Sequence, residues 1–319
     1  MAEPVLSIRD LSVDYVTDDG PVRAIDGVSL DVRRAEILGI AGESGSGKST
    51  LAQALLRILP PPAVITNGQV IFEGRDILKL DEAELRALRW KRISMVFQSA
   101  MDALNPVITV GEQIVDTLLA HDAATPHEAR ERAADLLELV GMPRDRLDSY
   151  AHQLSGGMRQ RVGIAMALAL EPAVVILDEP TTALDVVVER EILEQICALR
   201  DRLSFTVLFI THDLARMLQF ADRIAVFYAA EMVEIAPAAE LRRAPRHPYT
   251  QALMRAFPSV HGDRVEMSSI PGAPPSLRNP STGCRFHPRC DRAVDLCRER
   301  APELRLLGPD HAAACHLAE

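Results

Sequence analysis

The sequence of 319 residues lacks any apolar run long enough to cross a membrane as a helix. The longest candidate, Ile164 to Leu170, is cut by Glu171 and Pro172. The N-terminal residues also lack the basic segment and the apolar core of a secretory signal peptide. We therefore expect a soluble, cytoplasmic chain that reaches a membrane only through partner proteins.

Basic residues are too few to balance the acidic ones. The 35 Lys and Arg residues against 45 Asp and Glu residues give a formal net charge of −10, which argues against a protein that coats nucleic acid. The charge is uneven, because residues 241–319 carry 12 Arg and 8 acids, a balance of +4 that leaves −14 for the first 240 residues. Internal repeats and low-complexity tracts are absent. The basic segment predicts a separate C-terminal module.

A glycine-rich segment follows the apolar run at 37–41 and precedes four apolar residues at helical spacing, Leu51, Leu55, Ile58 and Leu59. It matches the phosphate-loop pattern G-x-x-x-x-G-K-[ST] with Gly42, Glu43, Ser44, Gly45, Ser46, Gly47, Lys48 and Ser49. In such a loop Lys48 reaches the β- and γ-phosphates, the Ser49 hydroxyl ligates Mg²⁺, and Thr50 completes the nucleotide site. A Gly-Ser turn with an accidental lysine is disfavoured by the strand–loop–helix context.

A second apolar run, 173–177, is typical of a central parallel strand and ends in Asp178 and Glu179. Carboxylates at that strand end emerge where ligands bind in open α/β sheets. Asp178 is expected to hold Mg²⁺ through its water shell, and Glu179 to polarise the attacking water. The alternative, a pair of acids that caps a helix beginning at Pro180, is weaker beside a phosphate loop.

Residues 154–158 read Leu-Ser-Gly-Gly-Met and lie between these two motifs. The three motifs in this order resemble the nucleotide-binding subunits of ATP-binding cassette (ABC) transporters. The resemblance implies that Ser155, Gly156 and Gly157 open a helix that points at the γ-phosphate held by an opposite subunit. Without that ligand, the segment would be a Gly-Gly turn before a helix.

Four further positions match the same family in order and spacing. The resemblance implies that Gln98 contacts Mg²⁺ and a moving helical subdomain, Asp185 lies at the subunit interface, and His212 senses the γ-phosphate. Tyr15 would stack on adenine, although an aromatic residue on a strand also fits simple packing. One departure is Ala35, where the family usually has glycine in a turn.

The implied fold is α/β, with a P-loop ABC ATPase core of mixed or parallel sheet, an antiparallel β subdomain and a helical subdomain at about 99–160. Helical periodicity at 110–119 and 127–140 fits this subdomain. Strand patterns at 224–227 and 232–235 close the cassette, which we place at 1–240. Eight prolines between 237 and 280 then break the pattern into loops and short helices, so that 241–319 forms a C-terminal extension.

The C-terminal extension narrows the resemblance to one group within the ABC transporter family. The segments 247–253, 270–275 and 283–290 are similar to the C-terminal region of the ATP-binding subunits of dipeptide and oligopeptide importers. That family implies ATP-driven uptake of peptides with a second related ATPase, two membrane permeases and an extracytoplasmic binding protein, at the cytoplasmic face of the cell membrane. Importers of nickel or glutathione share much of this extension and are the alternatives.

Five cysteines are present, and Cys197 is expected to be a small buried hydrophobe on a helix. The others follow the spacing C-x5-C-x6-C-x17-C at Cys284, Cys290, Cys297 and Cys315. Four thiolates suit Zn²⁺ or an iron–sulfur cluster, and a tight C-x2-C pair is missing. The family resemblance implies a [4Fe–4S] cluster, with Zn²⁺ second and unliganded thiols third.

Two further expectations concern that cluster. Its negative charge would be offset by the surrounding arginines Arg285, Arg289, Arg292 and Arg298. ATP binding would be independent of the cluster, because the phosphate loop would belong to a separate core.

Two rival functions are compared with the importer. The first is a soluble ABC-type ATPase that acts in DNA repair or on the ribosome. The DNA-repair form would carry a long coiled coil, and the sequence has no sustained heptads. The ribosomal form would usually carry two cassettes, and this chain has one. A regulatory ATP-binding module without turnover is disfavoured because Lys48, Asp178, Glu179 and His212 are all present.

Overall fold

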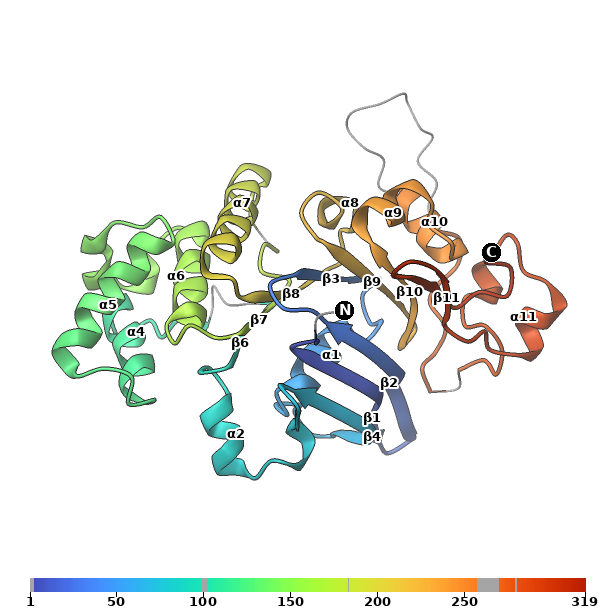
Figure 1. The fold of residues 1–319 in the computed structure, drawn as a ribbon, viewed down its shortest axis with the longest axis horizontal. Helices are drawn as coiled ribbons and strands as arrows, with labels where there is room; N and C mark the ends of the chain where they lie inside the picture. Colours follow the sequence, from blue (N-terminus) through green and yellow to red (C-terminus); the bar gives the residue numbers. More distant parts are fainter. Residues whose placement is uncertain (1–2, 99–102, 183, 257–269, 279) are drawn as a thin grey trace. The chain divides into compact units, whose positions relative to one another are not determined.

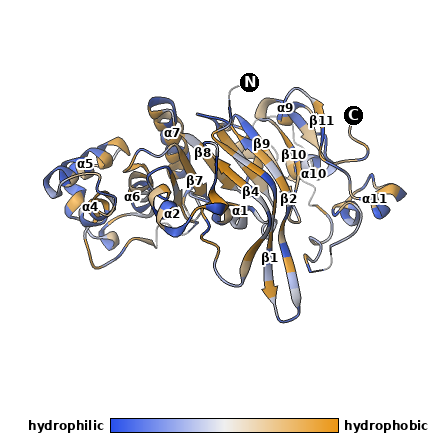
Figure 2. Ribbon diagram, turned by 60° about the horizontal axis from the view of Figure 1, so that its bottom comes forward, coloured by the Kyte–Doolittle hydropathy of each residue, from blue (hydrophilic) through white to orange (hydrophobic). Residues whose placement is uncertain are grey.

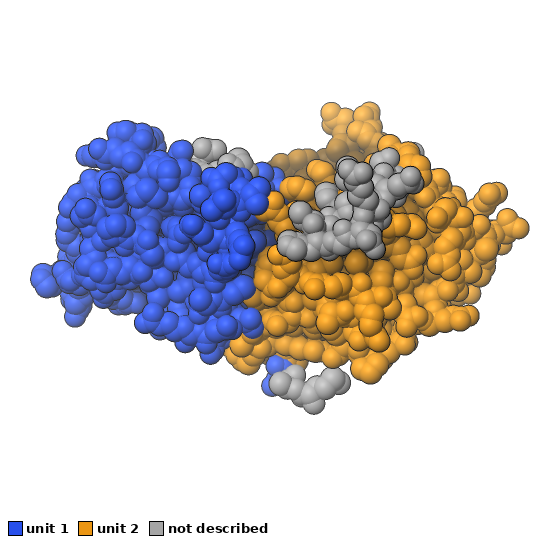
Figure 3. Space-filling model, turned by 90° about the horizontal axis from the view of Figure 1, so that it is seen from above, with its two compact units in different colours: residues 1–3, 79–209 blue, residues 4–78, 210–319 orange. Residues whose placement is uncertain are grey.

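A computed structural model describes residues 3–98, 103–182, 184–256, 270–278 and 280–319. The start of the expected helical subdomain at 99–102, Ala183 and Pro258 lie outside the described residues. The chain forms two compact units, which Figure 3 distinguishes by colour. The first unit is chiefly Lys79–Phe209, and the second combines Pro4–Leu78 with Ile210–Glu319. These units differ from the expected division at residue 240, which stays a prediction.

The first unit contains a short parallel sheet and a group of helices (Figure 1). In it β6 pairs in parallel with β7, and β8 lies next to β7. Its elements are α2 (Glu82–Leu88), β6 (Ile93–Val96), α4 (Val110–Leu119), α5 (Pro126–Leu139), the 3-10 helices η2 (Arg144–Asp148) and η3 (Ala151–Gln153), α6 (Gly156–Leu168), β7 (Val174–Asp178), α7 (Val186–Leu203) and the start of β8 (Thr206–Thr211).

Local capping explains where the helices of the first unit begin. The hydroxyls of Thr109 and Thr125 each accept a hydrogen bond from the backbone N–H of the glutamate three positions on. The carboxylates of these residues, Glu112 and Glu128, in turn accept a hydrogen bond from the backbone N–H of the threonine. These capping boxes start α4 and α5, which confirms the helices predicted at 110–119 and 127–140. All residues of β7 are buried, as expected for a central strand.

The second unit contains an antiparallel sheet in the order β2-β1-β4-β5. The second half of β2 alternates between buried and more exposed residues, whereas β1, which lies between β2 and β4, is buried over most of its length. In Figure 2 much of the hydrophobic colour follows the strands. The strands are β1 (Leu6–Thr17), β2 (Gly20–Val32), β4 (Ala63–Phe72) and β5 (Arg75–Asp76), followed by the 3-10 helix η1 (Ile77–Lys79).

A second group of strands in this unit has the order β11-β12-β10-β9-β3. β3 and β9 are parallel, and the remaining pairs are antiparallel. The elements are β3 (Ile37–Gly42), α1 (Lys48–Leu55), α8 (Leu214–Met217), β9 (Arg223–Tyr228), β10 (Glu231–Pro237), α9 (Ala238–Arg243), α10 (Pro248–Ala256), the 3-10 helix η4 (His287–Arg289), α11 (Asp295–Glu299), β11 (Arg305–Gly308) and β12 (His311–Ala313).

The C-terminal extension joins the cassette instead of forming a separate module. Strand β12 pairs with β10 through Glu234 with Ala313 and Ile235 with Ala312 (Figure 1). The positive charge predicts a separate module, whereas this pairing places β12 in the same sheet as β10. The charge balance says nothing about backbone pairing, which decides whether the segment belongs to the sheet.

Two smaller expectations and one disfavoured alternative are also corrected. Helix α1 ends at Leu55, because Arg57 adopts a left-handed conformation with φ of 51°, so Ile58 and Leu59 lie beyond it. The helix after Glu179 begins at Val186 and not at Pro180. Cys197 lies on α7 as expected, but it is only half-buried. Within the described ranges, no helix has both the length and the apolar character needed to span a membrane.

Candidate functional site

The phosphate loop connects β3 to α1 in the second unit. The Lys48 Nζ donates hydrogen bonds to the carbonyl oxygens of Gly42 and Glu43, both at 2.9 Å. The lysine side chain therefore folds back onto the phosphate loop. Gly47 has φ of 102°, and a Cβ there would lie 2.2 Å from the carbonyl oxygen of Ala24. Only glycine therefore fits at position 47. This residue is the N-cap of α1, so the helix begins directly at the end of the phosphate loop.

Two other predicted nucleotide contacts lie in the second unit. Tyr15 on β1 is half-buried, and its hydroxyl is 3.4 Å from the Thr50 Oγ1 on α1. His212 is exposed and comes directly after β8, where the Thr211 hydroxyl accepts a hydrogen bond from the Asp213 N–H. The positions fit stacking on adenine and sensing of phosphate, and both roles stay predictions.

The side chain of Glu43, the second residue of the phosphate loop, is held by the C-terminal extension. Arg289 donates to both of its carboxylate oxygens, at 2.8 and 3.1 Å. The Tyr249 hydroxyl accepts a hydrogen bond from the Glu43 N–H at 3.0 Å. Hydrogen bonding to Glu43 raises the pKa of Arg289. The extension therefore contacts the phosphate loop directly, a contact that the sequence does not predict.

The predicted catalytic carboxylate lies in the first unit, directly after β7. Gln98 and Thr182 both donate to the Oε2 of Glu179, at 2.9 and 3.0 Å. Glu179 has φ of 45°, a conformation that costs free energy in a non-glycine residue and is often found at functional sites. Asp178, one residue earlier, is 3% exposed. The structure thus brings Gln98 and Glu179 together, which the sequence predicted only as separate roles.

The Ser-Gly-Gly segment lies at the start of α6, as predicted. The Ser155 hydroxyl caps the helix by accepting a hydrogen bond from the Met158 N–H. Asp185 caps α7 by accepting from two backbone N–H groups. A Cβ on Gly157 would lie 2.5 Å from the Val188 Cγ1, so the first turns of α6 and α7 pack against each other at this glycine.

Comparison with known proteins decides the family. The family model described as "ABC transporter" matches residues 25–182, and the one described as "Oligopeptide/dipeptide transporter, C-terminal region" matches residues 233–297. A dipeptide transport ATP-binding protein DppD of Caldanaerobacter subterraneus is 43% identical over 318 residues, with 99% of this chain and 97% of the relative covered. The DppD of Escherichia coli is 42% identical, with 98% and 96% covered. The chain belongs to the ABC transporter ATPase family.

Solved structures agree with this assignment. The ATP-binding cassette MJ0796, solved as a post-hydrolysis dimer bound to ADP and Pi, has a TM-score of 0.66 and 29% identity over 73% of this chain and 98% of that one. The cbiO1 protein of Clostridium perfringens, part of the ABC transporter complex cbiONQ, has the same TM-score with 28% identity, covering 76% and 92%. The chain therefore has the fold of an ABC ATPase.

In this ABC ATPase the four clustered cysteines line one pocket of the extension, together with His247, His287 and His316. Burial raises the pKa of Cys284 to about 11, and the neighbouring Cys297 and Cys315 add to that rise. No three His, Cys, Asp or Glu side chains within the described part of the chain form a ready group of metal ligands. The four thiols therefore line one pocket, but within the described residues they are not arranged as a ready set of metal ligands.

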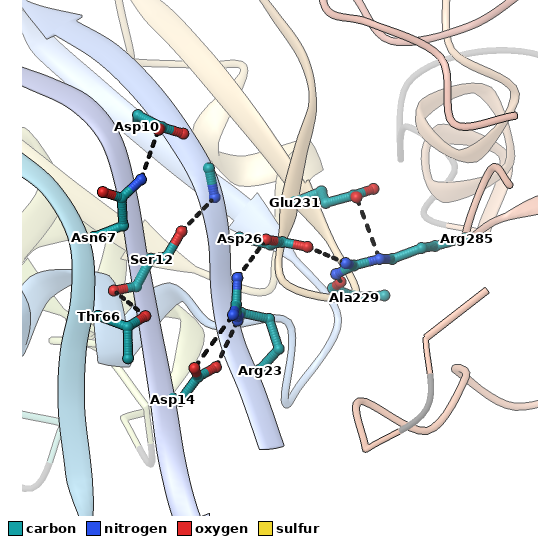
Figure 4. A network of polar contacts seen from close by, with 11 residues as sticks. Asp10, Ser12, Asp14, Arg23, Asp26, Thr66, Asn67, Ala229, Glu231 and Arg285 are labelled. Carbon is teal, nitrogen blue, oxygen red and sulfur yellow. Dashed lines mark hydrogen bonds and ion pairs between the residues drawn. The ribbon is translucent and has the colours of Figure 1, made fainter. Parts of the chain in front are cut away.

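Two arginines beside these cysteines have a role that differs from the expected one. Arg285, only 6% exposed, forms ion pairs with Asp26 on β2 and Glu231 on β10 (Figure 4). Arg289 pairs with Glu43. Both therefore neutralise carboxylates of the cassette, and neither lines the cysteine pocket. Arg292 lines the cysteine pocket, whereas Arg298 is exposed.

The extension is anchored on β9 and β10 by buried aromatic and polar contacts. Tyr228, Tyr249 and Phe286 pack with ring centroids 4.6 to 5.4 Å apart. The fully buried Glu234 accepts hydrogen bonds from the His247 N–H and interacts with the His311 Nε2 at 2.7 Å. The sequence marked 247–253 and 283–290 only as family segments; their joint contact with Glu43 was not foreseen.

Proposed function

We propose that this chain is the ATP-hydrolysing subunit of an importer that takes up dipeptides or oligopeptides. The observation that carries the proposal is the combination, in one chain, of the phosphate loop with an extension of the oligopeptide/dipeptide type that contacts it through Glu43. Near full-length relatives named as dipeptide transport proteins support the cargo class.

The residues of each unit fit the binding of ATP with Mg²⁺. Lys48 and the backbone at the start of α1 supply positive charge and N–H donors for phosphate oxygens. Ser49, Asp178 and Gln98 stay the Mg²⁺ ligands that the sequence predicts, because their hydroxyl, carboxylate and amide oxygens are of the kind that Mg²⁺ prefers. When bound, Mg²⁺ neutralises negative charge on the phosphate oxygens.

Hydrolysis would depend on Glu179. The hydrogen bonds from Gln98 and Thr182 orient its carboxylate, and this orientation allows it to accept a proton from the attacking water. His212 would contact the γ-phosphate. Because Gln98 contacts Glu179 directly, a shift of the Gln98 segment would alter the position of the catalytic carboxylate, which offers a route for coupling hydrolysis to movement.

We propose that a second, related ATPase completes the site. Its phosphate loop would receive the helix N-terminus at Ser155, Gly156 and Gly157, and Asp185 would lie at the interface. Two membrane permeases and an extracytoplasmic peptide-binding protein would complete the transporter at the cytoplasmic face of the membrane.

Co-purification and transport test this function. We expect the chain to co-purify with integral membrane proteins, and the assembly to take up a labelled dipeptide or oligopeptide only when ATP is present. Lys48→Ala, which removes the phosphate-binding ammonium, should abolish uptake. Uptake of nickel or glutathione but not of peptides would change the cargo. An ATPase that never co-purifies with membrane proteins would contradict the importer assignment.

We also propose that the cysteine pocket holds a [4Fe–4S] cluster, with Zn²⁺ as the alternative. Four thiols that line one pocket supply the number and type of ligands that such a cluster requires. The bound iron would keep all four as thiolates despite the burial that raises the pKa of Cys284. Ligation would also stabilise a proline-rich segment.

The cluster gives a direct spectroscopic prediction. Anaerobically purified protein should be brown and contain about four irons per chain, and Cys290→Ser should remove the colour. Cys197→Ser is the matched control, because Cys197 does not line the pocket. Colourless protein with one tightly bound zinc would replace the cluster with zinc. Metal-free protein with a folded extension would exclude both.

A further inference from the structure

We propose that Arg289 and Tyr249 of the extension are positioning residues for the phosphate loop, and that Arg289 sets the affinity for ATP by neutralising Glu43. The inference rests on the proposed nucleotide site, because it concerns how that site is held. It assigns to the extension a role in nucleotide binding that does not depend on what the cysteine pocket contains.

The carboxylate of Glu43 creates an electrostatic problem for a loop that binds a polyphosphate. Glu43 is the second residue of the phosphate loop, so its negative charge lies in the segment that surrounds the negatively charged phosphates. Like charges at short range repel each other, and partial burial weakens the screening by water. Glu43 has a side-chain exposure of 25%, so part of this repulsion would persist unless a cation compensates it.

Arg289 provides this compensation with the geometry of a strong ion pair. Its two terminal nitrogens each contact one oxygen of Glu43, the two-pronged arrangement that matches guanidinium to carboxylate. The arginine side chain is only 5% exposed and packs on the Tyr228 ring, 5.8 Å from its centroid. Its Nε donates to the Pro271 carbonyl oxygen at 2.8 Å. These contacts fix the guanidinium, so it can hold the carboxylate in one orientation.

Tyr249 fixes the backbone at the same residue. Its ring is fully buried, and its hydroxyl accepts a hydrogen bond from the Glu43 N–H. The extension therefore contacts both the side chain and the main chain of one loop residue. Two independent contacts to Glu43 indicate that the extension orders the entry of the loop, before Lys48 and the start of α1 receive phosphate.

The test measures equilibrium binding of a non-hydrolysable ATP analogue to the full-length protein. Arg289→Ala should weaken binding about tenfold, which corresponds to about 1.4 kcal/mol. Glu43→Gln alone is measured in the same assay as the reference for the double variant. The double variant, with Arg289→Ala and Glu43→Gln, should recover most of the lost affinity, because the repelling charge is gone. Tyr249→Phe, which keeps the ring, should weaken binding about twofold to fivefold.

The rescue separates positioning from a structural role. If Arg289 merely held the extension in place, Glu43→Gln would not restore affinity, and that result would overturn the proposal. Arg278→Ala is the matched control, because Arg278 is another arginine of the extension that pairs with a cassette carboxylate, Asp19, but both side chains are exposed. The Arg278→Ala variant should bind the ATP analogue with the affinity of the parent protein.

Different results would refute the nucleotide site and the positioning role of Arg289. If the parent protein itself does not bind the ATP analogue, and Lys48→Ala behaves like it, the proposed nucleotide site is wrong. If the parent binds it and Arg289→Ala binds it equally well, the nucleotide site stands and the positioning role is refuted. Far-ultraviolet circular dichroism checks each variant for folding, and the rescued double variant provides the comparison if Arg289→Ala is less stable.

Discussion

Replacing Glu179 with glutamine should lower the rate of ATP hydrolysis by about 10² to 10⁴ while ATP stays bound. The amide has the shape of the carboxylate, and its oxygen can still accept the hydrogen bonds that Gln98 and Thr182 donate to Glu179. It cannot accept a proton from water. The variant should therefore accumulate as a closed, ATP-loaded dimer.

The measurement compares turnover in the assembled transporter with the amount of ATP retained after rapid gel filtration. Glu194→Gln on α7 is the control, because this carboxylate pairs with Arg190 on the exposed surface and should not affect turnover. Hydrolysis by Glu179→Gln at the parental rate would remove Glu179 from the catalytic role.

Ser155→Arg should leave ATP binding by the chain's own phosphate loop nearly unchanged and strongly impair hydrolysis at the opposite site. The arginine removes the cap of α6, which typically costs about 0.5–2 kcal/mol, and places a long charged side chain where the γ-phosphate of the partner's ATP is expected. Ser155→Thr keeps a capping hydroxyl and should retain most of the activity.

The experiment requires a heterodimer in which each nucleotide site is followed separately by a labelled nucleotide. The expected pattern is normal binding at the loop that contains Lys48 and slow hydrolysis at the partner's site. The opposite pattern, with binding lost at this chain's own loop and the partner's site unaffected, would contradict the shared-site geometry.

Much of the fold and half of the site could be predicted from the sequence. The continuous apolar runs at 37–41 and 173–177 predict buried strands, and the helical periodicity at 110–119 and 127–140 predicts helices. The phosphate loop is predicted from its sequence pattern, and the family resemblance implies the helix start at Ser155, where the structure places a capping hydroxyl. These features are set by residues close together in the chain.

The contacts that the sequence could not supply join residues far apart in the chain. Gln98 lies 81 residues before Glu179, and Arg289 lies 246 residues after Glu43. Neither pairing has a periodic signal, because a charged or amide side chain pairs with whatever partner the backbone brings to it. The pairing of β12 with β10 was likewise missed, since a three-residue strand is too short to show alternation.

The sequence by itself determined the chemistry available to this protein: a lysine and glycines for phosphate, a carboxylate after a buried strand, and four thiols in the extension. Tertiary structure alone decided that Arg289 neutralises Glu43, that Arg285 faces Asp26 and Glu231, and that the four cysteines meet in one pocket. The physical reason is that strand pairing and the burial of Tyr228, Tyr249 and Phe286 set where the extension packs, and polar partners are chosen by that packing.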